Sequence, residues 1–155
     1  MMSVAPVASA GEAAGYYSNS DNYYFLGSLQ SLWMGEGAKE LGLEGNVRGD
    51  DLTAVLEGRL PDGSRLGKEV NGQHVHRPGH DLTFSAPKSV SILALIGNDK
   101  EMVEAHNHAV RVAAGYVEKL ISARDTKDGV TSIVHTGKMV AAAYTHDTSR
   151  NLDPQ

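Results

Sequence analysis

The chain has 155 residues, 41% of them hydrophobic, which is enough for one ordinary domain with a packed core. It has no cysteine, so disulfide frameworks and thiolate metal sites are excluded, and a reducing compartment fits. The net charge of −5 excludes a surface coated in positive charge but not a local basic groove. No apolar run is long enough to cross a bilayer, and the N-terminus lacks the features of a signal peptide.

Tyrosines are concentrated near the start of the chain. Residues 3–8 predict a short strand, at a sheet edge because of Pro6, and residues 11–17 predict a short helix. Four of the six tyrosines follow in GYYSNSDNYYF, as the pairs Tyr16-Tyr17 and Tyr23-Tyr24. A phenol can attack a phosphodiester and keep the phosphate as a covalent ester, so two such nucleophiles suit strand breakage and rejoining. The alternative is that these aromatic side chains anchor a short helix and a loop.

The middle of the chain predicts two helices and a long loop. The segment EGAKELGLEG predicts a helix that ends at Gly42 or Gly45. The segment DDLTAVLEG predicts a second helix, with Asp50 or Asp51 as its N-cap and Gly58 at its C-terminal end. Residues 62–80 are rich in glycine and polar side chains, and they predict a surface loop.

The second half predicts alternating strands and helices. Residues 81–85 alternate like a half-buried strand, and Pro87 then lies in the first turn of a helix that runs to about Ile96. Asp99 can cap a long helix over about 100–123. Its predicted apolar stripe comprises Val103, His106, Val110, Ala113, Val117 and Leu120 or Ile121. The segment DGVTSIVHTGKMVAAAYTHD predicts two strands joined tightly near Thr136-Gly137, followed by irregular polar chain.

Two residues near predicted strand ends are candidates for chemistry. His146 follows the last strand, where it can ligate a metal together with at least two further ligands. Asp81 begins its own strand, and its carboxylate can orient a ligating histidine or accept a phenolic proton. The alternative is that His146 caps a turn and that Asp81 bonds nearby backbone amides.

Histidines and cations elsewhere give weaker signals. The motif HVHRPGH, with His74, His76 and His80, suggests a metal site as a further hypothesis. However, alternate residues share a face only in a strand. Lys88 begins a predicted helix, whose N-terminus attracts phosphate. A basic groove can draw on Arg59, Arg65, Lys68, Arg77, Lys88 and Arg150, whose convergence the sequence does not show.

Several segments together resemble one family. They are MMSVAPVASAGEAAGYYSNSDNYY, LGLEG, LEGRLPDG, HRPGHDLTFSAPKSVS and HDTSRNLDPQ. In this order they resemble the N-terminal relaxase domain of the MobF-type (TraI/TrwC-like) conjugative relaxases, which are relaxase-helicases of the HUH endonuclease superfamily. The resemblance runs from residue 1 to residue 155. It implies an α+β fold of mixed α/β content, in which the antiparallel sheet of the palm is backed by helices.

The resemblance also implies an activity. Such enzymes nick single-stranded DNA at a plasmid origin of transfer through a 5′-phosphotyrosine, and later transfer or religate the strand. The family's nucleophile matches Tyr16, assisted by Tyr17, and Tyr23 or Tyr24 matches the second nucleophile. The family's acidic partner matches Asp81. DNA contacts are expected from Arg77, Lys88 and Arg150.

The family's cofactor and partners follow from the same resemblance. Three histidines hold a divalent cation, Mg²⁺ or Mn²⁺, which polarises the scissile phosphate, and the first of them matches His146. Relaxosome accessory proteins and a conjugative coupling protein are implied as partners, and the bacterial cytoplasm as the location.

The sequence departs from the family pattern at its end. The family's L-H-T-H segment, which supplies the other two metal ligands, would follow Gln155, and the helicase regions would lie further on. We therefore expect residues 1–155 to be the N-terminal part of a single relaxase domain, with an incomplete palm, and to be inactive alone. The alternative function is a single-stranded-DNA-binding or interaction module without chemistry, in which the tyrosines stack on bases.

Overall fold

The described strands of the protein pair in antiparallel ladders. The computed structural model describes residues 1–11, 13, 15 and 31–145. Within these ranges there are four ladders of two strands each: β1 (Met2–Pro6) with β5 (His80–Phe84), β2 (Ser31–Met34) with β8 (Ala141–Tyr144), β3 (Lys68–Val70) with β4 (Gln73–Val75), and β6 (Ser122–Lys127) with β7 (Val130–His135). The expected mixture of helices and antiparallel strands is confirmed.

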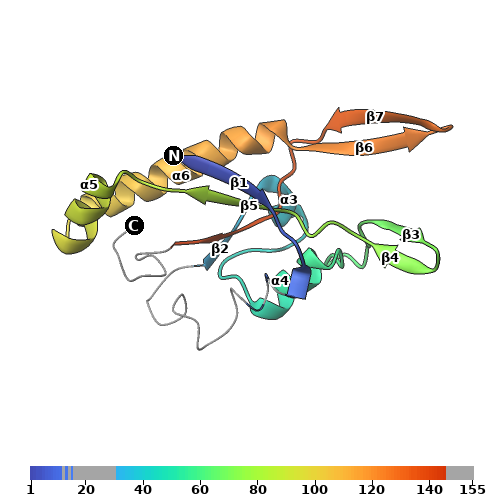
Figure 1. Ribbon diagram of the computed structural model, residues 1–155, viewed down its shortest axis with the longest axis horizontal. Coiled ribbons are helices and arrows are strands. Elements are labelled where there is room, and N and C mark those ends of the chain that lie inside the picture. The colour runs from blue at the N-terminus through green and yellow to red at the C-terminus, as the bar shows by residue number, and fades with distance from the viewer. Residues whose placement is uncertain (12, 14, 16–30, 146–155) are drawn as a thin grey trace.

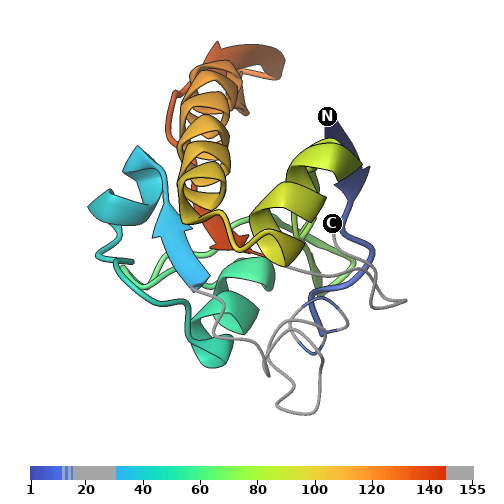
Figure 2. The same cartoon turned by 90° about the vertical axis from the view of Figure 1, so that its left-hand side faces the viewer.

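Helices lie on both sides of the strands. They are α3 (Glu36–Glu40), α4 (Gly49–Leu56), α5 (Lys88–Ser91), the π-helical η1 (Ile92–Ile96) and α6 (Lys100–Leu120). In both views β8 lies between α6 on one side and α4 on the other (Figures 1 and 2). In the described part of the chain, no helix combines the length and apolar composition that a bilayer crossing requires.

The core lies where α3 and α4 cover the β2–β8 ladder. Trp33 on β2 is 7% exposed and packs with Ala38, Leu43 and Leu52. The chain between α3 and α4 also holds β2, because Trp33 N donates to the Gly45 carbonyl at 3.0 Å. Half-buried side chains complete the cluster, namely Leu41, Val47, Val55, Leu56, Val140, Ala142 and Tyr144. The position of β8 is therefore fixed by apolar packing as well as by its ladder.

The long helix agrees with its sequence pattern. Asp99 is its N-cap, and Oδ1 of Asp99 accepts from the Met102 amide at 3.2 Å. The predicted apolar stripe is at least half-buried from Val103 to Val117. Of the two alternatives for the end of the stripe, Ile121 is half-buried, whereas Leu120, the last residue of α6, is 72% exposed.

The predicted loop over residues 62–80 is wrong in part, because it contains the β3–β4 hairpin. Asn71 and Gly72 connect the strands, with φ of 52° and 75°. Positive φ at both central residues is the geometry of a type I′ turn, for which Asn-Gly is the preferred pair. Glycine-rich composition favoured a loop, but this dipeptide was the stronger local signal.

The prediction of two strands joined near Thr136-Gly137 is also wrong in its pairing. β7 pairs with β6 through the turn at Asp128-Gly129, and β8 pairs instead with β2. Asp-Gly is a type I′ signal of the same kind, and β6 itself was missed. Figure 1 shows the β6–β7 hairpin extending beyond the end of α6.

Two helix starts differ from the prediction. The N-cap of α4 is Arg48, without a side-chain cap, and Asp50 and Asp51 lie in the first turn, where a carboxylate still favours the helix dipole. Pro87 is the N-cap of α5 and not a residue of its first turn. Gly42 and Gly58, with φ of 71° and 78°, do follow the ends of α3 and α4 as expected.

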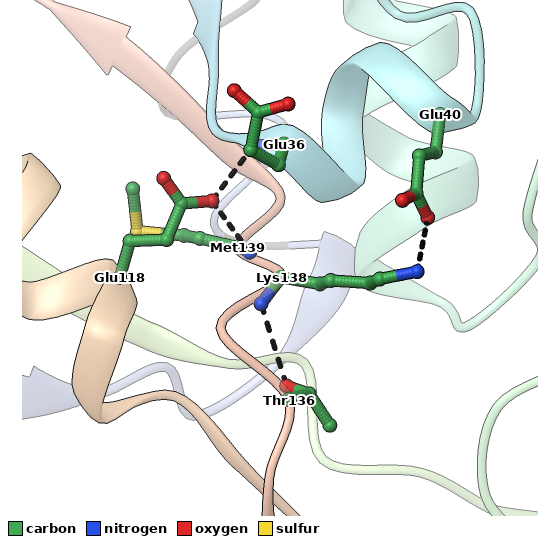
Figure 3. Close-up of polar contacts among 6 residues, drawn as sticks. All are labelled: Glu36, Glu40, Glu118, Thr136, Lys138 and Met139. Carbon is green, nitrogen blue, oxygen red and sulfur yellow. Dashed lines mark hydrogen bonds and ion pairs between the residues drawn. The ribbon is translucent and has the colours of Figure 1, made fainter.

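One carboxylate joins three segments that are distant in sequence. Glu118, near the end of α6, accepts from the amide of Glu36 at 2.7 Å and from the amide of Met139 at 3.0 Å, both through Oε1 (Figure 3). Glu36 begins α3, and Met139 precedes β8. Beside it, Lys138 Nζ reaches Glu40 Oε2 at 2.7 Å. Glu118 therefore fixes the start of β8 against α3 and α6.

The Leu52→Ala substitution tests the core. Leu52 is 6% exposed, so its truncation leaves a cavity and is expected to cost about 2–5 kcal/mol of unfolding free energy. Denaturant unfolding followed by fluorescence reports on this region directly, because Trp33 is the one tryptophan of the chain. The control is Leu120→Ala at a 72% exposed position, with an expected change within about 0.5 kcal/mol. Equal losses in the two variants would contradict this core.

The Glu118→Ala substitution tests the carboxylate junction. It leaves the amides of Glu36 and Met139 without this acceptor, and we expect a loss of about 1–3 kcal/mol. Hydrogen exchange at both amides is expected to accelerate. Glu118→Gln, which keeps an acceptor oxygen, is expected to restore part of the protection. The control is Glu104→Ala on an exposed position of the same helix; if it accelerated exchange at the same two amides equally, the junction would be refuted.

Candidate active site

Asp81 is the predicted catalytic residue that the structure describes. It is exposed on β5, where its backbone lies opposite Ala5 of β1. Hydrogen bonds continue the ladder beyond both strand ends: the terminal amine of Met1 donates to the Ser85 carbonyl at 2.6 Å, and Val7 N donates to the Gly79 carbonyl at 3.0 Å. The chain that leads to the tyrosines therefore leaves the sheet beside the start of β5, next to Asp81.

The four candidate tyrosines, Tyr16, Tyr17, Tyr23 and Tyr24, lie outside the described residues, as do His146 and Arg150. The described chain on either side of them is nevertheless informative. After residue 30 the chain enters β2, whose first residue, Ser31, pairs with Tyr144, the last residue of β8. His146 is two positions beyond Tyr144 in sequence. Ser31, the first described residue after the tyrosines, therefore lies beside the end of the strand that precedes His146 in sequence.

Tyr144 is the described tyrosine next to this position, and the sequence did not single it out. It packs against the core cluster, and burial raises the pKa of its phenol. A raised pKa disfavours the phenolate that a nucleophile needs. Tyr144 therefore acts as packing at the β8 end, and the structure gives no reason to move the nucleophile from the predicted pairs.

The predicted DNA-binding cations do not converge within the described chain. Arg77 is exposed before β5, and Lys88 is exposed after it, at the start of α5. The five residues of β5 between them span roughly 17 Å. These two side chains therefore belong to opposite ends of β5 and not to one cluster, and Arg150 lies outside the described residues.

The histidines of HVHRPGH are divided between two places. His74 and His76 lie together on and just after β4, whereas His80 begins β5 opposite Pro6. Across residues 1–11, 13, 15 and 31–145, no three His, Cys, Asp or Glu side chains are grouped so that they can hold a metal ion. The described residues therefore give no support to a metal site in this motif.

Arg59 and Arg65 do come together, which the sequence alone did not show. They are partners in an isolated antiparallel bridge, and both line a pocket with His74 and His76. Their separation of six positions around the PDG turn was visible in the sequence, and it was the one available signal of this pairing.

Comparison with known proteins assigns the chain to a family. The family model of the TrwC relaxase matches residues 10–155. Over 155 residues the chain is 54% identical to the multifunctional conjugation protein TraI of Escherichia coli K12 and 53% identical to another Escherichia coli TraI, and it spans 9% of the length of each.

Solved structures agree with the sequence match. The conjugative relaxase TrwC in complex with oriT DNA, in its metal-free form, aligns with a TM-score of 0.82 and 37% identity, over 99% of this chain and 52% of that chain. The metal-bound TrwC complex with oriT DNA gives the same TM-score at 38% identity, over 53% of its chain. The protein thus belongs to the TrwC relaxase family.

Proposed function

We propose that the protein is the N-terminal part of a conjugative relaxase, which nicks single-stranded DNA at an origin of transfer and keeps the 5′ end on a tyrosine. The main support is the match to TraI along the whole chain at 54% identity. The pairing of β1 with β5 is consistent with this proposal, because it holds the described chain that precedes the tyrosines against the strand that carries Asp81.

The proposed reaction is one in-line displacement at phosphorus. The phenolic oxygen of Tyr16 attacks the scissile phosphate, and a bond from oxygen to phosphorus forms. The bond from phosphorus to the 3′ oxygen of the preceding nucleotide breaks, and that oxygen leaves as a 3′-hydroxyl after taking a proton. The carboxylate of Asp81 accepts the phenolic proton, and its exposed position leaves room for the strand. Tyr17 assists Tyr16, and Tyr23 or Tyr24 carries the second transfer that rejoins the strand.

The proposal includes a divalent cation, to which this chain would contribute one ligand. When bound, the cation would polarise the scissile phosphate as a Lewis acid, and His146 would supply one imidazole to it. Among the residues that the structure describes, no cluster of three such ligands is present. The metal-bound and copper-bound TrwC complexes support metal binding in the family without choosing between Mg²⁺ and Mn²⁺.

The relatives also indicate the substrate and the partners that we propose for this protein. TrwC has been solved with a 27-mer DNA that comprises the recognition hairpin and the cleavage site, which supports DNA of this kind as the substrate class here. We extend the proposal to relaxosome accessory proteins and to a coupling protein, since TraI is described as a conjugation protein.

The Tyr16→Phe substitution tests the nucleophile. The protein is joined to the remaining half of a TrwC-type relaxase domain and incubated with Mg²⁺ or Mn²⁺ and an origin-containing single strand. A band that keeps its shift on a denaturing gel is expected for the unmodified protein, because the phosphotyrosine bond survives denaturation. Tyr16→Phe is expected to abolish it.

The matched control is Tyr116→Phe, because Tyr116 is 66% exposed on α6 and contacts Lys119. Its adduct yield is expected to equal that of the unmodified protein. An unchanged yield in Tyr16→Phe would refute the nucleophile. A shift that is seen only on native gels would favour DNA binding without chemistry.

The Asp81→Asn substitution tests the proton acceptor. Asparagine keeps the size of the side chain but cannot take a proton, so single-turnover cleavage is expected to slow by roughly 10²–10⁴-fold. Thr83→Ala, at an exposed position of the same strand, is the control and is expected to leave the rate unchanged. A rate within a few fold of the unmodified protein in Asp81→Asn would exclude Asp81 from the reaction.

A further inference from the structure

A pocket of about 430 Å³ lies at the base of the β3–β4 hairpin. Residues 8–10, which follow β1, form one wall, and the end of α4 with Leu56 and Glu57 forms another. The remaining lining includes four side chains that are cationic or can become so: Arg59, Arg65, His74 and His76. Such a concentration is unexpected on a chain with a net charge of −5.

The two arginines are placed against each other. Arg59 and Arg65 face one another across an antiparallel bridge, a position in which like charges destabilise the pair. The carboxylate of Glu57 offsets the charge of Arg59, since Glu57 Oε2 accepts from Arg59 Nε at 3.1 Å and also contacts Nη2. No described residue forms a hydrogen bond or ion pair with the side chain of Arg65. An anion between the two guanidinium groups would relieve their repulsion.

The histidines approach this pair because two glycines leave space. A Cβ at Gly58 would lie 3.0 Å from ring atoms of His76, and a Cβ at Gly67 would lie 3.2 Å from His74 Nε2. Both glycines have positive φ, of 78° and 106°, which disfavours other residues. Burial, and then the proximity of His74, lowers the pKa of His76. The imidazole of His76 is therefore mostly neutral at pH 7 and available to gain a proton when an anion arrives.

We propose that this pocket binds a backbone phosphate of single-stranded DNA, held by Arg65 and Arg59 with His74 and His76. Guanidinium groups bind phosphate oxygens in a bidentate manner, and exposed arginines make the pocket accessible to a polymer. The proposal rests on the function proposed above. It adds a contact with the strand next to Ala10, which is six positions before Tyr16 in sequence.

The first test uses inorganic phosphate as the probe. The histidine Cε1–H resonances of the 155-residue chain are followed by NMR during a phosphate titration at constant ionic strength. Saturable shifts are expected at His74 and His76 and not at His108, which is exposed on α6. The Arg65→Gln substitution is expected to remove the saturation. An absence of shifts at both pocket histidines would overturn the proposal.

The second test uses a single-stranded oligonucleotide, with binding measured by fluorescence anisotropy from low to moderate salt. All variants carry Tyr16→Phe, so that only non-covalent binding is read and a failure of the nicking chemistry cannot affect the result. Arg65→Gln is expected to lower the slope of log K against log salt by about 0.7, the value for one phosphate contact on a single strand. Arg65→Lys is expected to restore most of this slope, because it keeps the charge. Trp33 fluorescence checks that each variant is folded.

The matched control is Arg124→Gln on the exposed β6 strand, which removes the same charge far from the pocket in sequence. Its slope is expected to stay unchanged. If Arg124→Gln and Arg65→Gln lowered the slope equally, general electrostatics would explain the binding and the pocket would be refuted. Phosphate could shift the histidine resonances while Arg65→Gln leaves the salt dependence of oligonucleotide binding unchanged. In that case the pocket would accept small phosphate anions and the DNA assignment would be wrong.

The pH dependence gives a separate readout. The charged and titratable groups that line the pocket are Glu57, Arg59, Arg65, His74 and His76, and among them burial lowers the pKa of His76. Because phosphate favours the protonated imidazole, oligonucleotide affinity is expected to rise as the pH falls from 8 to about 6. His76→Gln is expected to flatten this rise. A rise of the same size in His76→Gln would exclude His76 from the contact.

Discussion

The antiparallel pairing of β2 with β8 is the contact on which the rest of the site depends. Ser31 lies opposite Tyr144, so the first described residue after the tyrosines and the last residue of the strand before His146 are held together. Trp33 buries the inner face of this ladder against α3 and α4, and Glu118 fixes the start of β8 through the Met139 amide. A second ladder, β1 with β5, holds the described chain that precedes the tyrosines against the strand of Asp81. The two ladders thus fix the described chain on both sides of the tyrosines and before His146.

The proposed reaction needs few chemical groups. A phenol, a proton acceptor and a bound phosphate must meet, and catalysis of this kind depends mostly on positioning. Asp81 is held by its strand and is open to a substrate, and Tyr144 fills the core with a phenol whose pKa burial raises. The pocket of Arg59 and Arg65 would add a second contact with the strand. Binding energy from such a contact can orient the strand for attack.

Local features were predictable from the sequence, and long-range ones were not. The Asp99 cap, the stripe from Val103 to Val117 and the β5 strand follow from neighbouring residues, and the structure confirms them. The hairpin turns at Asn71-Gly72 and Asp128-Gly129 were also visible locally. The first was missed because the glycine-rich composition around it favoured a loop. The second was missed because the strands were expected to pair around Thr136-Gly137. The β2–β8 ladder, the acceptor role of Glu118 and the meeting of Arg59 with Arg65 depend on contacts between distant segments or on turn geometry, which periodicity does not report. The candidate site residues came from resemblance to a family, and of these the structure locates Asp81, Arg77 and Lys88.

The most direct measurement is the proximity of the tyrosine segment to the end of β8. Because the chain has no cysteine, the pair Tyr16→Cys and His146→Cys can be joined by a short bis-maleimide without background reaction. The account predicts an intramolecular cross-link in the folded protein, lost in denaturant, and none when Tyr16→Cys is paired with Arg124→Cys on β6. Failure of the first pair to cross-link, or equal yields from both pairs, would contradict the claim that these ladders assemble one site.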